Sequence, residues 1–175
     1  MNQIPLSSEP GKLFIGGLNI VDKPDSMEEQ GITHIVSVLE YDHCDWEEYE
    51  RYQRLWFAVE DHPSHNLLQH FERANAFIDN ALASGGTVLV HCAMGISRSA
   101  TVVCAYLMHK QNVAFLEALR QLQEARPQCY PNSGFGEQLA IYGRMMKVSS
   151  SDERQDLYSE WLAKGTDASK LSGHE

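Results

Sequence analysis

Apolar residues along this chain gather first in short runs and then at helical spacing. Four short runs, rich in β-branched or aromatic residues, predict strands at residues 13–18, 32–39, 54–59 and 87–90. Ser26-Met27-Glu28-Glu29 matches a capping box, so a short helix is expected to begin at Ser26. From Leu67 to Leu82 the apolar residues recur every three or four positions, which predicts an amphipathic helix.

The second half of the chain is helical in pattern. It runs from Arg98 to about Lys147, with breaks at Pro127 and Pro131 and near Gln111. Strands that alternate with helices predict an α/β fold, in which helices flank a mixed central sheet. A length of 175 residues suits one domain. We place this domain at residues 11–148, after an extension at 1–10 and before a tail at 149–175 that is helical and then polar.

Charge and composition restrict the partners and the cellular compartment that we expect. The net charge is −10, and residues 1–61 hold 13 acidic and 4 basic side chains. This balance argues against nucleic acid and anionic membrane surfaces as partners. The four cysteines form neither a C-x-x-C motif nor a paired framework, and the N-terminus lacks the pattern of a secretory signal. We therefore expect a reducing compartment, cytoplasmic or nuclear.

The candidate chemistry follows the apolar strand at 87–90. His91-Cys92-Ala93-Met94-Gly95-Ile96-Ser97-Arg98-Ser99 leads directly into a helix. A tight loop between a strand and a helix N-terminus turns its N–H groups inward and forms an anion site. Gly95 permits the backbone geometry, and the guanidinium of Arg98 can grip two oxygens of a tetrahedral anion. The predicted anion-binding residues are Ala93, Met94, Gly95, Ile96, Ser97 and Arg98.

Cys92 lies at the base of this loop. The helix N-terminus and Arg98 are expected to lower its thiol pKa by a few units, which makes the thiolate a nucleophile at neutral pH. A buried structural cysteine beside an ordinary turn is the simpler alternative. The glycine, arginine and serine at fixed spacing favour the nucleophile.

Residues 91–99 resemble the signature loop of cysteine-dependent protein tyrosine phosphatases, and other segments resemble its dual-specificity branch. The similarity spans about residues 11–147 and includes Arg126-Pro127 and the Pro131-Asn132-Ser133-Gly134-Phe135 segment. The pattern is most similar to phosphatases, fungal ones especially, that carry a C-terminal zinc-binding domain. No cysteine follows Cys129, so the resemblance implies a catalytic domain from a longer parent chain.

Phosphoryl transfer to a thiolate needs an acid for the leaving group and then a base for water. Asp61, on a turn 31 residues before Cys92, is predicted to do both. In the family the acid precedes an Asn-Leu pair by five residues, and here Asn66-Leu67 matches. The resemblance implies that Ser99 assists departure of the Cys92 thiolate and that Asn66 and Asn132 support the site. His91 is expected to buttress the loop.

Other residues carry less signal. Cys104 is expected in the core, and Cys44 in an exposed loop. Six carboxylates between Glu40 and Glu50 predict either a solvated face or a surface that selects partners. His62 and His65 are expected to shape the loop that bears Asp61.

These observations predict a dual-specificity protein phosphatase that hydrolyses phosphotyrosine and phosphoserine or phosphothreonine in phosphoproteins through a phosphocysteine, without a metal or cofactor. Uncharged side chains within the loop make a phosphoinositide substrate less favoured. Two alternatives stay open at this point. One is a non-catalytic phospho-binding or scaffolding module of the ribosome-assembly type; the other is a rhodanese-like sulfurtransferase.

Overall fold

The computed structural model describes residues 1–7, 9–44 and 47–171. Its centre is a sheet whose five strands lie in the order β1 (Asn2–Ile4), β2 (Lys12–Gly17), β5 (Thr87–Cys92), β3 (His34–Leu39), β4 (Gln53–Ala58). β1 pairs with β2 in antiparallel fashion, and the other neighbours are parallel. The sheet is therefore mixed, as the alternation of strands and helices predicted.

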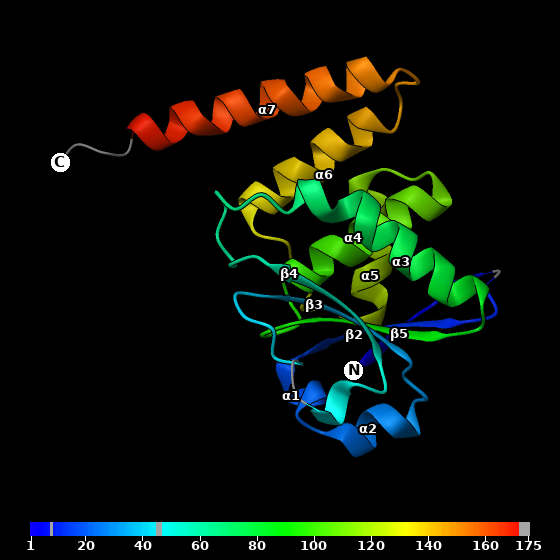
Figure 1. Cartoon of the computed structure of the whole chain (residues 1–175). Coiled ribbons are helices and arrows are strands. Elements are labelled where there is room, and N and C mark those ends of the chain that lie inside the picture. The colour runs from blue at the N-terminus through cyan, green and yellow to red at the C-terminus, as the bar shows by residue number, and fades with distance from the viewer. Residues whose placement is uncertain (8, 45–46, 172–175) are drawn as a thin grey trace.

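Helices cover both faces of the sheet (Figure 1). α1 (Leu18–Val21) and α2 (Pro24–Glu29) lie on one face. The opposite face carries a larger layer, which consists of α3 (Phe71–Ala83), α4 (Arg98–Gln111), α5 (Phe115–Ala125) and α6 (Ser133–Met145). After α6 the chain turns back, and α7 (Ser151–Leu171) runs across α6. Two short 3₁₀ helices lie at Glu47–Tyr49 and Leu68–His70.

The middle of both layers is deeply buried. All six residues of β5 are buried, since strands flank it on both sides and helices cover both faces. Every residue of α4 from Arg98 to Met108 is buried as well, which makes α4 the central helix of the larger layer. β5 ends and α4 begins at the sequence motif, so two deeply buried elements of the fold hold the candidate site.

Three features of the N-terminal third differ from the sequence predictions. Helix α2 begins at Pro24, before the capping-box Ser26, because a proline at the first helical position is already set at a helical φ. Residues 2–4, assigned to an extension, form the edge strand β1. The short helix α1 was not predicted, since its four residues are too few for a periodic signal.

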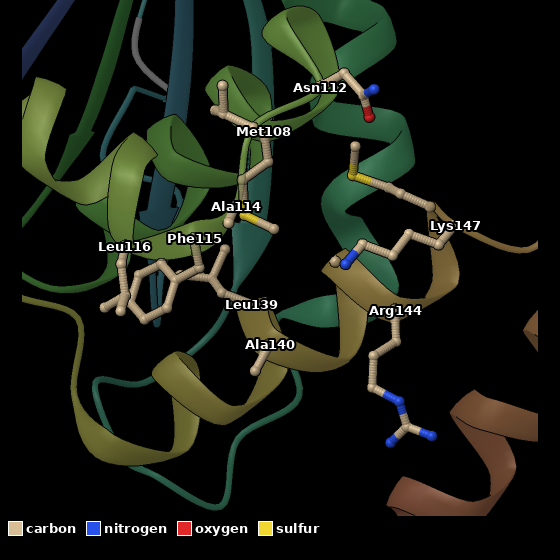
Figure 2. Close-up of a pocket in the computed structure, with 12 residues that line it drawn as sticks. Met108, Asn112, Ala114, Phe115, Leu116, Leu139, Ala140, Arg144 and Lys147 are labelled. Carbon is tan, nitrogen blue, oxygen red and sulfur yellow. The ribbon is translucent and has the colours of Figure 1, made fainter.

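An apolar groove of about 490 Å³ lies between the C-terminal end of α4, the start of α5 and the second half of α6. Figure 2 shows Phe115, Leu116 and Leu139 along this groove, with Lys147 reaching toward it and Arg144 pointing from α6 toward α7. Asn112, in the left-handed region at φ 54°, ends α4 beside it. Within the described residues, no helix is both long and apolar enough to cross a membrane.

Candidate active site

Residues 92–98, here called the anion loop, join β5 to α4. The loop is held by Leu18, whose N–H donates to the carbonyl of Ala93 at 2.9 Å. Gly95 has φ +68°, and a Cβ at that position would lie 2.5 Å from the carbonyl carbon and oxygen of Gly16. Glycine is thus required here both by the backbone conformation and by the close approach of β2.

The Cys92 sulfur lies at the base of the anion loop and is 1% exposed. The N–H of Gly95 donates to Cys92 Sγ at 3.2 Å, and Ser99 Oγ is also 3.2 Å from Sγ. The Gly95 N–H, the Ser99 hydroxyl and the N-terminus of α4 therefore surround the sulfur. The contact places Ser99 where the resemblance required it, while its role in catalysis stays a prediction.

Arg98 is anchored through one end of its guanidinium. Nη1 donates to the carbonyl of Val59 at 3.0 Å and pairs with Glu40 Oε1 at 2.9 Å. Nε is buried and has no hydrogen-bond partner among the described residues; the carboxylate oxygen Asp61 Oδ2 is 3.9 Å from it. A buried, unpaired N–H is costly, so this atom needs an acceptor that an oxyanion in the loop would supply.

Glu40 is a site residue that the sequence analysis missed. It follows β3 directly, and a hydrogen bond from its own backbone amide, with the contact to Arg98, holds the Glu40 pKa below its usual range. The signal that could have found it is topological, because residues just after neighbouring parallel strands meet at one edge of the sheet. The remaining acidic segment is partly described; Asp45 lies outside the described residues.

The structure brings Asp61 to the anion loop. Its Oδ1 accepts from the Ser97 hydroxyl at 2.6 Å and from Asn132 Nδ2 at 2.9 Å. Asn132 also caps α6, since its Oδ1 accepts from the Phe135 N–H at 2.9 Å. The Asp61 side chain is 37% exposed, so its carboxyl is in reach of both solvent and the anion site.

Residues 59–67, here called the acid loop, are tied down on either side of Asp61. Gln138 of α6, fully buried, accepts from the Leu67 N–H and donates to the His65 carbonyl, both at 2.8 Å. His65 Nδ1 accepts from the Glu60 N–H at 3.2 Å, so the expected part of His65 in shaping this loop is visible. The Asn66 side chain faces α7, where Nδ2 donates to the Tyr158 hydroxyl, and its part in supporting the site stays a prediction.

Residues from the segment between α5 and α6 also hold the anion loop, through hydrogen bonds to its carbonyl groups. Arg126 Nε donates to the Gly95 carbonyl at 2.9 Å, and its Nη1 donates to Asn2 Oδ1 at 2.8 Å. The Tyr130 N–H donates to the Ile96 carbonyl at 2.8 Å. Arg126 entered the sequence analysis only as part of the Arg-Pro resemblance, without a role, and β1 reaches the site through it.

Of the remaining residues, His91 and Cys104 lie where the sequence predicted and Cys44 does not. His91 is fully buried and its Nε2 lies 2.7 Å from Ser37 Oγ. Burial lowers the pKa of His91 to about 4, so the ring is neutral at pH 7 and suited to support. Cys104 is in the core as expected. Cys44 is not exposed: it packs inward beside Ser37, and burial raises its thiol pKa to about 11.

Comparisons with known proteins agree with this geometry. The family model for the dual specificity phosphatase catalytic domain matches residues 13–145. Human dual specificity protein phosphatase 12 is 38% identical over 148 residues, which cover 80% of this chain and 42% of that protein. The tyrosine-protein phosphatase yvh1 of Schizosaccharomyces pombe is 49% identical over 90 residues, covering 51% of this chain and 27% of the relative.

Among solved structures, the Yvh1 phosphatase domain from Chaetomium thermophilum has a TM-score of 0.73 and 30% identity, and the match covers 86% of this chain and all of that one. The predicted likeness to fungal-type members is therefore confirmed. The chain spans less than half the length of the two curated relatives named above.

Proposed function

The chain belongs to the dual specificity phosphatase family, and from that premise we propose that it hydrolyses phosphotyrosine and phosphoserine or phosphothreonine esters in phosphoproteins. One observation supports this proposal more strongly than any other observation does. A buried thiol with two hydrogen-bond donors, an arginine with an unpaired buried N–H and a carboxyl group all converge on one seven-residue loop.

In the first step, Cys92 Sγ attacks phosphorus as the thiolate, and the bond from phosphorus to the ester oxygen breaks. Backbone N–H groups of residues 93–98 and the Arg98 guanidinium hold the three non-bridging oxygens. Asp61, protonated, gives its proton to the departing oxygen. The product alcohol or phenol leaves, and the phosphoryl group stays on Cys92 as S-phosphocysteine.

In the second step, a water molecule attacks the phosphocysteine and gives its proton to the Asp61 carboxylate. The sulfur–phosphorus bond breaks, inorganic phosphate forms, and the electron pair returns to Cys92 Sγ. The Ser99 hydroxyl, 3.2 Å from this sulfur, donates to the departing thiolate and stabilises it. Asp61 thus regains the proton that the next cycle needs.

The hydrogen bonds of Asp61 suit both of its states. Ser97 and Asn132 donate to the same oxygen, Oδ1, so Oδ2 is left for the proton that is transferred. Oδ2 is also the oxygen that faces Arg98 Nε at 3.9 Å.

The side chains of the anion loop favour protein substrates. Ala93, Met94, Ile96 and Ser97 are uncharged, and none can grip the additional phosphates of a phosphoinositide. The Met94 side chain is 68% exposed at the loop, where it can contact an apolar part of the substrate. All four cysteines are free thiols, which supports a cytoplasmic or nuclear location where Cys92 stays reduced.

The test is steady-state kinetics with a chromogenic aryl phosphate and with phosphotyrosyl and phosphothreonyl peptides, in the presence of a strong chelator. We expect turnover of all three classes and inhibition by micromolar vanadate. No turnover of any substrate, with phosphopeptide binding retained, would instead establish a phospho-binding module. Transfer of sulfur from thiosulfate to cyanide would indicate the sulfurtransferase alternative.

A further inference from the structure

Helix α7 lies outside residues 13–145, which the family model matches, yet it is packed onto the domain. Figure 1 shows α7 running back across α6. Tyr158 and Trp161 of α7 are half-buried against the main core, and their ring centroids are 6.0 Å apart. The first half of α7 is therefore a docked part of the fold.

The docked face of α7 reaches the acid loop. The Tyr158 hydroxyl accepts a hydrogen bond from Asn66 Nδ2 at 2.8 Å. Asn66 in turn organises the end of the loop, since its Oδ1 accepts from the Gln69 N–H at 3.2 Å and its carbonyl accepts from Gln69 Nε2 at 2.9 Å. Asn66 is five residues from Asp61, so the contact fixes the end of a short segment that carries the acid.

The other side-chain anchors of the acid loop come from within the matched domain. Gln138, in α6, holds residues 65–68 through three hydrogen bonds of 2.8 Å. Asn132 and Ser97 hold Asp61 itself. Tyr158 supplies a side-chain anchor of this loop that comes from outside residues 13–145.

We propose that Tyr158 is a positioning residue for Asp61, and that α7 braces the acid loop from outside the catalytic domain. The proposal rests on the proposed function. To act, Asp61 must present Oδ2 to the ester oxygen in the first step and to the attacking water in the second, while Ser97 and Asn132 hold Oδ1. A fixed end at Asn66 limits the positions that the segment can take and keeps Asp61 near the reacting oxygen.

Tyr158→Phe removes the hydroxyl and keeps the ring packing. We expect kcat for an alkyl phosphate, a phosphothreonyl peptide, to fall about fivefold, the rate equivalent of one neutral hydrogen bond. For p-nitrophenyl phosphate, whose leaving group needs no proton, kcat should change less than about twofold. The alkaline limb of the pH–rate profile, which reports loss of the general acid, should change only for the phosphothreonyl peptide.

Two control variants separate positioning from packing. Trp161→Phe changes the neighbouring ring on the same helix without touching Asn66, and Leu116→Ser changes the remote groove of Figure 2. Neither should alter the ratio of kcat between the two substrates. Asn66→Ala should change the ratio in the same direction and at least as much as Tyr158→Phe, since it also removes the contact to the Gln69 N–H. Adding Tyr158→Phe to Asn66→Ala should change nothing further, because the contact between the two side chains is already lost.

The outcomes are distinct. If wild-type protein turns over neither substrate, the proposed function fails. If wild type is active and Tyr158→Phe leaves both substrates unchanged, or lowers both equally, the positioning role is overturned. An equal change of ratio in Trp161→Phe would also overturn it, since general loosening of α7 and not the Tyr158 hydroxyl would then be the cause.

Discussion

The anion loop and the acid loop meet at Asp61, and they are built in opposite ways. In the anion loop, Cys92, Ser97 and Arg98 are each no more than 7% exposed, and consecutive residues of one segment create the site. In the acid loop the Asp61 side chain is 37% exposed, and the loop is held by Ser97 of the anion loop, by Asn132 just before α6 and by Tyr158 of α7. The nucleophile is thus placed by local sequence and the acid by tertiary structure, which predicts different responses to substitution.

The largest effect is expected at the centre of the anion loop. Cys92→Ser should abolish turnover, because a serine hydroxyl at neutral pH is a far weaker nucleophile, while phosphopeptide binding persists since the N–H donors and Arg98 are unchanged. Steady-state rates and calorimetric binding of a phosphotyrosyl peptide measure the two properties. A variant that kept a tenth of the wild-type rate would contradict the phosphocysteine mechanism.

In the acid loop, Asp61→Asn should lower kcat by about 10²–10³ for alkyl phosphates and poor aryl leaving groups. The loss should diminish as the leaving group improves, because a stable phenolate departs without a proton. A series of substituted aryl phosphates measures this slope. An equal loss across the series would show that Asp61 acts only on structure.

This contrast also explains what the sequence could predict. The anion loop was found because nine contiguous residues between a strand and a helix carry it. Asp61 was found from a turn and its distance to Cys92. Glu40, Gln138 and Tyr158 were given no role from the sequence, because their contacts join segments far apart in the chain and leave no local pattern.

Cys44 shows that the burial of a single side chain is also hard to predict from the local sequence. It lies among six carboxylates, and the composition of the segment predicted an exposed side chain, yet the thiol points inward at Ser37. Composition describes the average environment of a segment and not the direction of one side chain. The strands and long helices were predicted well for the converse reason, since periodicity is averaged over many residues.

Burial of His91 beneath the anion loop makes stability depend on pH. With a folded-state pKa of about 4 and an unfolded value near 6.5, the unfolded chain binds the proton more readily, so stability is lost as pH falls from about 6.5 to 4. The loss attributable to His91 is about 3 kcal/mol. The free energy of unfolding in urea, measured at pH 7 and pH 4.5 for wild type and His91→Asn, isolates the contribution of His91 to this loss of stability. If the free energy of unfolding of His91→Asn fell with pH as steeply as that of wild type, His91 would not be the group that binds a proton on unfolding.

Asn132 links the two loops, and two substitutions separate its contacts. Asn132→Ala removes both the donor to Asp61 and the cap of α6, whereas Asn132→Ser keeps a good cap but is too short to hold Asp61. Both should lower kcat about tenfold for a phosphothreonyl peptide. The alanine variant should be less stable than the serine variant by about 1 kcal/mol. If the two variants were equally stable but differed in kcat, neither the capping role of Asn132 nor its contact with Asp61 would be assigned correctly.

The smallest effect concerns charge around Asp61, where the acid loop meets the substrate. The Glu40 and Glu60 side chains are 44% and 61% exposed, and the low pKa of Glu40 keeps it ionised. Phosphopeptides with acidic flanks should therefore bind about two- to fivefold more weakly than neutral ones, the range of exposed charge pairs.

Glu60→Gln removes one of these charges without touching Arg98, and it should reduce the penalty for acidic peptides while leaving kcat for p-nitrophenyl phosphate unchanged. Salt should do the same, because the Debye length falls from about 10 Å at 0.1 M to about 3 Å at 1 M. Values of kcat/KM for matched acidic, neutral and basic phosphopeptides at both salt concentrations measure the effect. The buried groups of the anion loop are screened far less, so a penalty that survives 1 M salt would place its origin there and not in the exposed carboxylates.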